Sequence, residues 1–190
     1  MCGALQSGLI AGMLLHVVVD VLGLTYRTIH LPNDSALVAR NRRDACIETF
    51  GDDASFEGDV RYLAWLKDKV EEYPDGFVLA FDGLKCVGHL ELEVPYGLSA
   101  GYVNLFYIMR EFRGSGYGAR LHAFAERYFR SWEAHRIELH VSPTNRRAME
   151  FYRKLGYHTV RLEGSDSPLW RMELTLTAAA RNNPAENSGQ

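Results

Sequence analysis

Three glycines at alternate positions are the residues of this chain best suited to bind an anion. Gly114, Gly116 and Gly118 follow an apolar run that ends at Met109, and they precede a stretch with helical spacing. Glycines let backbone N–H groups approach a ligand closely. A helix start adds unpaired N–H groups and the positive end of a dipole. The order of strand, glycine loop and helix therefore predicts a pocket for phosphates, most naturally for a pyrophosphate.

Two familiar phosphate loops fit these residues poorly. A Walker loop ends in Gly-Lys-Ser/Thr, whereas Ala119 and Arg120 follow Gly118 here, so nucleoside triphosphate hydrolysis is disfavoured. A dinucleotide fingerprint has the spacing G-x-G-x-x-G almost directly after its strand. This chain has G-x-G-x-G, and four residues separate Met109 from Gly114. A plain glycine-rich turn is the remaining alternative.

A second group of residues downstream completes a recognisable pattern. Asn145 and Ala148 precede Phe151-Tyr152, and Gly156-Tyr157 follows them. With Arg113-Gly-Ser-Gly-Tyr-Gly118, these positions match two motifs of the GNAT superfamily of N-acetyltransferases. The first motif is Gln/Arg-x-x-Gly-x-Gly/Ala, and the second is an Asn, an Ala, Phe-Tyr and Gly-Phe/Tyr. The chain resembles this superfamily from about residue 24 to residue 176.

The resemblance implies that acetyl-CoA is the co-substrate and that its pyrophosphate binds the loop amides. The pantetheine arm would run beside the strand that ends at Ile108, and a backbone N–H near Ile108 would hold the thioester oxygen. Asn145 would hydrogen-bond the pantetheine arm, and Tyr152 would act as the general acid that protonates the departing thiolate. The cofactor-binding residues expected from the resemblance are Ile108, Met109, Arg113, Gly114, Ser115, Gly116, Tyr117, Gly118, Ala119 and Asn145.

These roles have structural alternatives. Phe151 and Tyr152 also have the positions expected of an apolar helix face, with no chemical role. Arg113 is as well explained as a solvated loop charge as by a direct phosphate contact. The presence of Asn145 before Tyr152 and of Gly156 after it favours the chemical role for the tyrosine.

No residue is an obvious acceptor for the proton of the amine. Several superfamily members use a Glu or His on the strand before the glycine loop, where this chain has Tyr102 and Asn104. Neither is a base near neutral pH. We expect ordered water to take the proton, positioned by Asn104 or by Glu91 and Glu93 on the neighbouring strand. The alternative for these two glutamates is a solvated or ion-paired face of the sheet.

An acidic segment lies between the first two helices, where the resemblance implies that the acceptor cleft is bordered. Asp52, Asp53 and Glu57 would form an anionic rim that attracts an amine or a basic peptide over a distance. A solvated charged loop is the alternative. The expected reaction is direct transfer of the acetyl group to a primary amine of a small molecule or peptide. A catalytically quiet relative that binds acyl-CoA as a sensor or scaffold is the alternative.

The elements that position these residues follow from periodicity. The turn signal Asp82-Gly83 predicts a hairpin, and Thr144 is expected to cap the last helix. Helices are predicted over about 34–50, 62–73, from 118 onward and from 144 onward. Strands are predicted near 24–29, 77–81, 85–94, 102–109, 136–141, 157–162 and 170–176. The order predicts an α/β (α+β) fold with a mixed, mostly antiparallel central sheet of six to seven strands, flanked by about four helices.

Length and charge fit a single domain without metal support. The 190 residues can bury a core, and a net charge of −3 provides no basic field for nucleic acid. The three cysteines are scattered and lack metal-ligand spacing, which indicates free thiols in a reducing cytoplasm. We expect an acetyltransferase domain over 24–177, an apolar extension over 1–23 and a disordered tail over 178–190.

The apolar extension is the least regular part of the sequence. It has no basic residue before Arg27, so a secretory signal is disfavoured. Asp20 in hydrocarbon would cost about 2.5–3.5 kcal/mol, which disfavours a membrane anchor. We expect the segment to pack as a helix or strand. A homodimer contact through this segment and the final strands is a further expectation.

Overall fold

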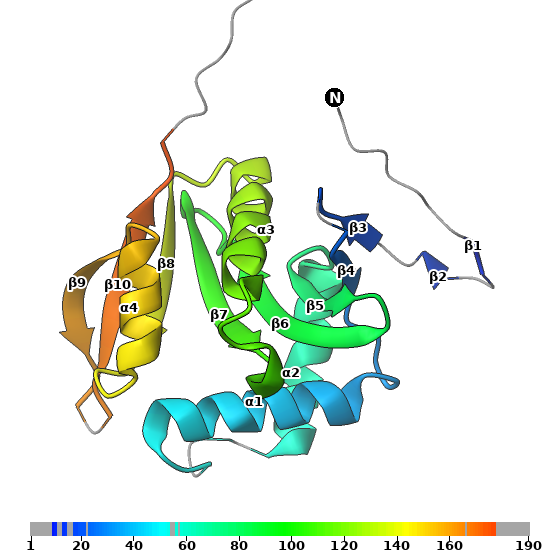
Figure 1. Ribbon diagram of the computed structural model, residues 1–190, viewed down its shortest axis with the longest axis horizontal. Helices are drawn as coiled ribbons and strands as arrows, with labels where there is room; N and C mark the ends of the chain where they lie inside the picture. The colour runs from blue at the N-terminus through cyan, green and yellow to red at the C-terminus, as the bar shows by residue number, and fades with distance from the viewer. Residues whose placement is uncertain are drawn as a thin grey trace, which may run out of the picture.

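The computed structural model describes residues 9–10, 13–14, 17–21, 23–53, 56, 58–165 and 167–177. Most of its strands belong to one sheet of eight, in the order β3-β4-β5-β6-β7-β8-β10-β9 (Figure 1). A separate pair joins β1 (Leu9–Ile10) to β2 (Met13–Leu14). The strands of the large sheet are β3 (Val17–Val19), β4 (Thr25–Thr28), β5 (Phe77–Asp82), β6 (Lys85–Glu93), β7 (Ala100–Ile108), β8 (Arg136–Val141), β9 (His158–Glu163) and β10 (Leu169–Thr175).

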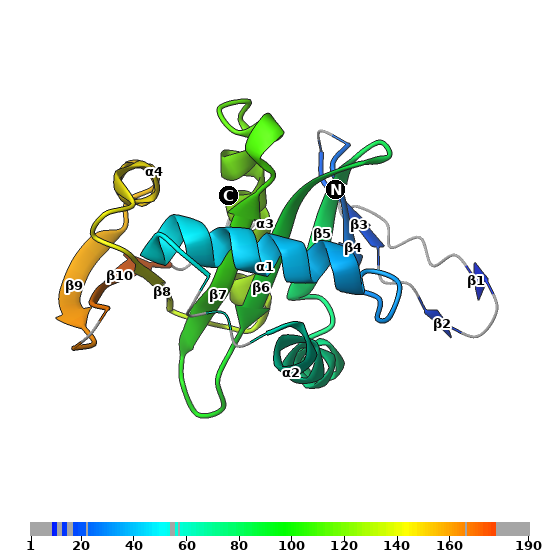
Figure 2. The ribbon, with the colours of Figure 1, turned by 90° about the horizontal axis from the view of Figure 1, so that it is seen from below.

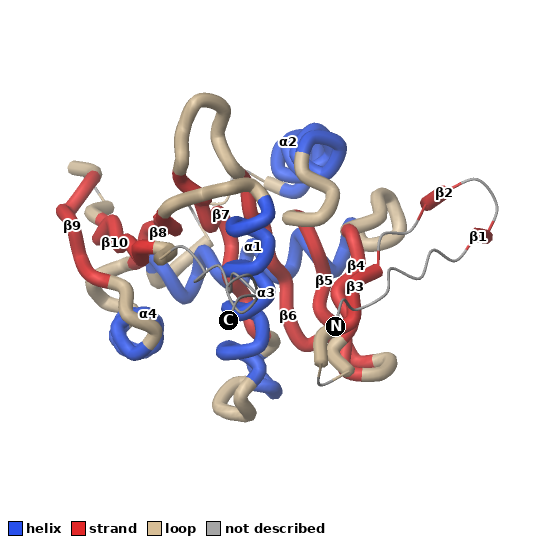
Figure 3. The backbone as a smooth tube through the Cα atoms, turned by 90° about the horizontal axis from the view of Figure 1, so that it is seen from above, coloured by secondary structure: helices blue, strands red, loops and turns tan. Residues whose placement is uncertain are grey.

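Helices cover both faces of this sheet. The helices α1 (Ser35–Phe50) and α2 (Asp59–Glu72) lie on one face, and α3 (Tyr117–Ser131) and α4 (Arg146–Lys154) lie on the other (Figure 2). Figure 3 shows α2 and α4 on opposite sides of the strands. A single 3-10 turn, η1 (Arg110–Phe112), joins β7 to the glycine loop. The predicted architecture of a mixed, mostly antiparallel sheet with four helices is confirmed.

The sheet has more strands than the six to seven predicted, because part of the apolar extension joins it. Residues 17–19 pair with β4 as an antiparallel edge strand. Three consecutive valines favour an extended backbone. Asp20 then accepts two hydrogen bonds from Arg120 of α3, at 2.9 and 3.1 Å, which ties the segment to the body of the fold.

Several expectations about the ends of the chain lie outside the described residues. These are the expectations for residues 1–8 and for the tail from residue 178 onward. In the described part of the chain, none of the helices has the length and apolar character needed to cross a membrane.

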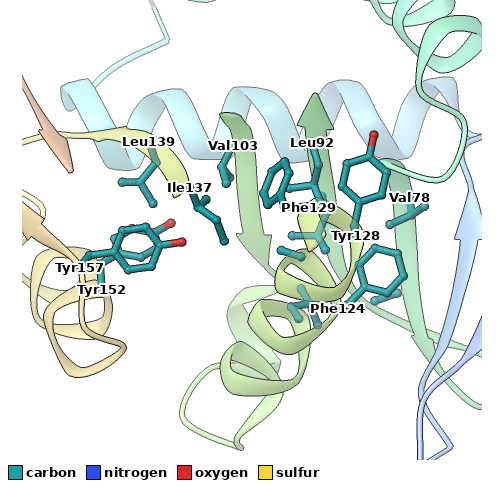
Figure 4. Close-up of a cluster of buried hydrophobic side chains, with 14 of the residues drawn as sticks. Val78, Leu92, Val103, Phe124, Tyr128, Phe129, Ile137, Leu139, Tyr152 and Tyr157 are labelled. Carbon is teal, nitrogen blue, oxygen red and sulfur yellow. The ribbon is translucent and has the colours of Figure 1, made fainter. Parts of the chain in front are cut away.

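The apolar residues divide into cores on the two faces. The larger core lies under α3 and α4, where Phe129 and Ile137 are fully buried (Figure 4). The second lies between α1, α2 and the β4–β6 part of the sheet, around Leu66 and Phe77. The sheet is therefore packed against a hydrophobic core on each of its two faces.

The strands β7 and β8 pair in parallel only along their first halves, from Ala100–Arg136 to Val103–Leu139. Opposite β7, Leu92 pairs with Val103, whereas Glu91 pairs with Leu105. Asn104 is therefore an extra residue, a β-bulge that bends the strand. Beyond it, β7 and β8 diverge, and Figure 1 shows them spread apart toward α1.

Candidate functional site

A cavity of about 450 Å³ lies beside the second half of β7, beyond the part of β7 that pairs with β8. Its walls come from α1, the second half of β7, the glycine loop and α4. Met109, Ser115, Tyr117, Asn104 and Glu93 are not among its lining residues. The other residues that the sequence indicated do line it: Ile108, Arg113, Gly114, Gly116, Gly118, Ala119, Asn145 and Tyr152.

The cavity reaches both faces of the sheet. On one face it is lined by Ala45 and Thr49 of α1. On the other face it is lined by Tyr152 of α4, and Phe106 of β7 packs there against the larger core. Tyr107 points the opposite way and donates a hydrogen bond to Asp44 of α1 at 2.9 Å. The lining of the cavity therefore includes residues from helices on both faces of the sheet.

The second half of β7 presents backbone donors to this cavity. The N–H of Met109 donates to the carbonyl of Val87 on β6, at 3.0 Å. Because N–H directions alternate along a strand, those of Phe106 and Ile108 point away from β6, toward the gap. The carbonyl of Ile108 already accepts a hydrogen bond from Arg113 Nε at 2.9 Å. The two N–H groups can hold a strand-like ligand or a developing oxyanion.

Each glycine of the loop has its own structural reason. Gly114 and Gly116 have φ values of +80° and +84°, in the left-handed region that favours glycine. Gly116 is also the N-cap of α3, so the N–H groups of the first helical residues face the loop. At Gly118 a Cβ atom would lie 2.9 Å from the ring of Phe151. This third glycine therefore lets α3 and α4 approach each other beside the cavity.

Arg113 is an ion-paired residue and not a solvated loop charge. It donates to the carboxylate of Glu48, which also accepts from Arg147 at 3.1 Å. Glu48 lies 3.6 Å from Arg110 as well. The carboxylate thus connects the end of α1 to the glycine loop and to α4 at the wall of the cavity. The roles of Glu48 and Arg147 have no local sequence signal, because their partners lie far along the chain.

The two remaining predicted loop residues lie to the side of the cavity. Ser115 is exposed, and Tyr117 donates a hydrogen bond from its hydroxyl to Asp82. Met109 is buried in a small cluster with Leu105 and Tyr107. Any contact that these residues make with a ligand would be through their backbone.

Asn145, and not Thr144, caps α4. Its Oδ1 accepts a hydrogen bond from the N–H of Ala148 at 3.1 Å. The prediction for Thr144 was wrong because its hydroxyl lies 2.8 Å from that of Ser142, with which it shares a hydrogen bond. The cap uses the oxygen of the Asn145 amide, while the NH2 is a separate donor.

Tyr152 lies at the junction of the cavity and the larger core. Its ring lies edge-on to that of Phe106, with centroids 6.2 Å apart, and 5.3 Å from the centroid of Tyr157. Figure 4 shows the rings of Tyr152 and Tyr157 together beside Ile137. Burial raises the pKa of the Tyr152 phenol. The hydroxyl therefore stays protonated near neutral pH and can act as a donor.

The two glutamates named as possible water-positioning residues are ion-paired. Glu91 is fully buried and accepts hydrogen bonds from the Tyr62 hydroxyl at 2.5 Å and from Arg42 at 3.2 Å. Burial raises the pKa of Glu91, although Arg42 acts in the opposite direction. Glu93 forms an ion pair with Lys69 at 2.7 Å. The ion-paired alternative therefore describes both residues.

Asn104 contributes mainly through its backbone. Its carbonyl accepts a hydrogen bond from Arg42 at 2.9 Å. Its side-chain nitrogen is buried and has no hydrogen-bond partner in the described part of the chain.

The acidic rim is partly neutralised. Arg43 pairs with Asp59 at 2.6 Å and lies 3.8 Å from Asp53. Glu57, which the sequence analysis included in the rim, lies outside the described residues. The remaining field is weaker than the sequence suggests, because opposite charges this close cancel over a distance.

The sequence analysis missed a chain of hydrogen bonds across three strands. The Tyr102 hydroxyl lies 2.9 Å from His140 Nδ1, and His140 Nε2 lies 2.8 Å from a Glu163 oxygen. Polar residues at alternate positions of β8, Arg136, Glu138 and His140, were the available signal. Among the residues described, no group of three or more His, Cys, Asp or Glu could hold a metal ion.

The comparisons with known proteins agree on one family and one fold. The model of the acetyltransferase (GNAT) family matches residues 39–157. No curated protein matches the sequence. Spermidine N-acetyltransferase from Vibrio cholerae, in complex with CoA and spermine, has a TM-score of 0.65 and 18% identity, covering 80% of this chain and 95% of its own.

Two further solved structures are similar. Ard1 from Thermoplasma volcanium has a TM-score of 0.67 and 21% identity, over 82% of this chain and 99% of its own. Ribosomal-protein-alanine N-acetyltransferase from Brucella melitensis has a TM-score of 0.63 and 18% identity, over 80% of this chain and 99% of its own. At these identities the likeness is one of fold.

Proposed function

This chain belongs to the acetyltransferase (GNAT) family, and we propose that it transfers the acetyl group of acetyl-CoA directly to a primary amine of a small molecule or peptide. Acyl transfer is the reaction class of the family. The observation that carries the proposal is the cavity beside the second half of β7, which the glycine loop borders and whose lining includes residues of helices on both faces of the sheet. Such a cavity suits a reaction between two substrates that bind on opposite sides.

The cofactor half of the proposal rests on the glycine loop and β7. The pyrophosphate would accept hydrogen bonds from the N–H groups at the start of α3, from residue 117 to residue 119. The pantetheine arm would follow the N–H groups of Phe106 and Ile108, with the NH2 of Asn145 as a further donor. The Vibrio cholerae neighbour, which is in complex with CoA, supports this co-substrate.

The chemical step needs a hydrogen-bond donor for the carbonyl oxygen of the thioester and an acid that protonates the sulfur of CoA. As the amine attacks the thioester carbon, negative charge develops on the carbonyl oxygen, and an N–H of β7 stabilises it. The C–S bond then breaks, and Tyr152 donates its proton to the sulfur of CoA. Burial raises the pKa of Tyr152, which keeps the proton on the phenol but makes it a weaker acid. The proposed role therefore rests on the position of Tyr152 at the cavity and not on its pKa.

The acceptor would approach from the face covered by α1 and α2. Asn104 and Glu93 stay in the proposal as groups that order water near the amine. The rim at Asp52 and Asp53 favours a cationic acceptor, although Arg43 weakens it. Among the structural neighbours are a spermidine N-acetyltransferase and a ribosomal-protein-alanine N-acetyltransferase. Their names support an amine as the acceptor, either on a small molecule or on a protein.

Release of CoA thiol tests the proposal. The protein is mixed with acetyl-CoA and a panel of polyamines, aminoglycosides, amino acids and peptide N-termini. Thiol release that depends on one class of amine supports the enzyme. A thermal shift with acetyl-CoA but no thiol release with any amine would instead support a quiet acyl-CoA binder.

A further inference from the structure

We propose that Tyr102, His140 and Glu163 form a relay that takes the proton from the acceptor amine. The inference rests on the proposed function, since it concerns the step that makes the amine a nucleophile. The two family motifs contain none of these residues. They lie on three different strands, β7, β8 and β9, so the relay exists only in the folded chain.

The relay faces the side from which the acceptor approaches. At Gly101 a Cβ atom would lie 2.1 Å from the ring of Phe129 on α3, so residue 101 points toward α3. Because side chains alternate along a strand, Tyr102 points to the opposite face, on the side of α1 and α2. This face is opposite the glycine loop and α4, where the cofactor is proposed to bind.

The relay also lies at the point where the strands separate. His140 directly follows Leu139, the last residue of β8 that pairs with β7. Tyr102 lies two positions before the bulge at Asn104. The relay therefore stands at the closed end of the gap whose open end contains the cavity. None of the three residues lines the cavity, so an amine that contacts the Tyr102 phenol must extend from the cavity toward this end of the gap.

The protonation states of Tyr102 and Glu163 determine which group donates in each hydrogen bond of the relay. Burial raises the pKa of Tyr102, so the phenol keeps its proton and donates it to His140 Nδ1 at 2.9 Å. The proton of the neutral imidazole is then on Nε2 and is donated to Glu163 at 2.8 Å. The hydrogen bond with His140, followed by that with Arg161, lowers the pKa of Glu163. Glu163 is thus a carboxylate that holds the tautomer.

The proton transfer is balanced within these groups. An N–H bond of the amine breaks as the proton passes to the phenol oxygen of Tyr102. The phenol proton passes at the same time to His140 Nδ1, which produces an imidazolium beside the carboxylate of Glu163. The His140 side chain is 24% exposed, so it can return the proton to water before the next cycle. No further reactant is needed.

The surrounding charges tolerate an imidazolium. Arg171 of β10 lies opposite His140 in the register, and it pairs with Glu138 at 3.0 Å and with Glu173 at 2.5 Å. Arg171 also lies 3.9 Å from Glu163. Arg161 pairs with Glu163. The other charged groups that act on the network are those around Tyr102: Glu93, Arg42, Glu163 and Glu138.

The test compares rates of acetyl transfer across pH 6 to 9. His140→Gln is expected to lower kcat roughly 10²-fold at pH 7, because general-base assistance contributes about 10²–10⁴-fold. The deficit should shrink as pH rises, because more of the amine is already neutral. The KM for acetyl-CoA should not change. His158→Gln, an exposed histidine on β9, is the matched control and should reproduce the wild-type profile.

Two outcomes would overturn the relay. One is a pH profile for His140→Gln that equals that of the wild type. If that variant does not fold, Tyr102→Phe gives the same test, because it removes only the hydroxyl, and a wild-type profile would again count against the relay. Absence of thiol release from the wild type with every amine would instead overturn the proposed function and the relay together.

Discussion

Asn145 caps α4 through its side-chain oxygen, so its position is explained even without a ligand. Its proposed second role is to donate a hydrogen bond from its NH2 to the pantetheine arm. Asn145→Ser separates the capping role from this binding role, because serine is about as good a cap but lacks the amide NH2. We expect an unchanged Tm and a KM for acetyl-CoA raised about 10-fold, which corresponds to a hydrogen bond of roughly 1–1.5 kcal/mol. Steady-state kinetics and a thermal melt provide the two readouts.

Asn145→Ala is the control for that experiment. It removes the cap as well, so the free energy of unfolding should fall by about 1 kcal/mol. A wild-type KM for acetyl-CoA in Asn145→Ser would leave Asn145 with the capping role alone.

Tyr152 and Tyr157 provide a matched pair of phenols. Tyr152→Phe keeps the ring that packs in the core and should lower kcat roughly 10²-fold, as expected for the loss of a general acid. Tyr157→Phe removes a hydroxyl that lies 3.2 Å from His122 Nε2, so it should cost about 1 kcal/mol of stability and leave kcat unchanged. Equal kcat values for the two variants would reduce Tyr152 to a core residue.

At this scale, sequence motifs locate residues but not their partners. The resemblance to the family motif singles out Tyr152 and Asn145. The pairing of Arg113 with Glu48 joins residues 65 positions apart, and that of His140 with Glu163 joins residues 23 apart. Neither pairing has a local signature, because each depends on how the strands and helices pack.

At the scale of elements, the contact between α3 and α4 depends on Gly118. In Gly118→Ala the new Cβ atom would lie 2.9 Å from the Phe151 ring, which forces the helices apart beside the cavity. We expect a lower Tm and a raised KM for acetyl-CoA. Phe151→Leu shortens the opposing side chain, so the double variant should recover part of the loss.

A double-mutant cycle measures that recovery. Because the two residues are in contact, their effects on stability should be non-additive by at least about 0.5 kcal/mol. Strictly additive effects would mean that Gly118 acts through backbone freedom and not through contact with Phe151.

The elements themselves were largely predictable, since most have a clear period of hydrophobic residues. The helix α1 is an exception, because its buried residues are Val38, Ala39 and Asn41. The bulge at Asn104 was not, because a bulge is a property of two paired strands and β7 alone reads as an ordinary strand. The edge strand at residues 17–19 was also left undecided, since an apolar run of that kind fits a helix or a strand until a partner such as β4 is known.

For the whole molecule, a buried histidine predicts acid sensitivity. His89 of β6 is fully buried, and neither ring nitrogen has a hydrogen-bond partner among the described residues. Burial lowers its pKa to about 3, whereas an unfolded histidine titrates near 6.5. The unfolded chain therefore binds a proton that the native state lacks in this window. Stability should be fully present above pH 6.5 and fall by up to about 1.4 kcal/mol per pH unit below it.

His89→Leu isolates this contribution. Urea unfolding between pH 7 and 4 should show a shallower loss of stability in the variant than in the wild type. Glu91, whose raised pKa acts in the opposite direction, is present in both proteins, and its carboxylate lies 3.4 Å from His89 Nε2 in the wild type. His158→Gln should retain the wild-type slope. Equal slopes for the wild type and His89→Leu would show that His89 does not cause the acid sensitivity.

The family and the general architecture were accessible from sequence because two motifs and the order of elements agreed. The acceptor side was not, because its charged residues are neutralised by partners from other elements. Arg43 at the rim and Lys69 beside Glu93 are examples. A count of acidic residues along the chain does not reveal such pairing.

The central claim is that an acetyl group passes directly from acetyl-CoA to an amine in the gap between β7 and β8. Mass spectrometry after a single turnover with isotopically labelled acetyl-CoA tests it most directly, with amines from the responsive class as acceptors. The account predicts label on the amine nitrogen, none on the protein, and a marked decrease in Tyr152→Phe. Label retained on the protein, or CoA thiol released with no labelled amine, would contradict it.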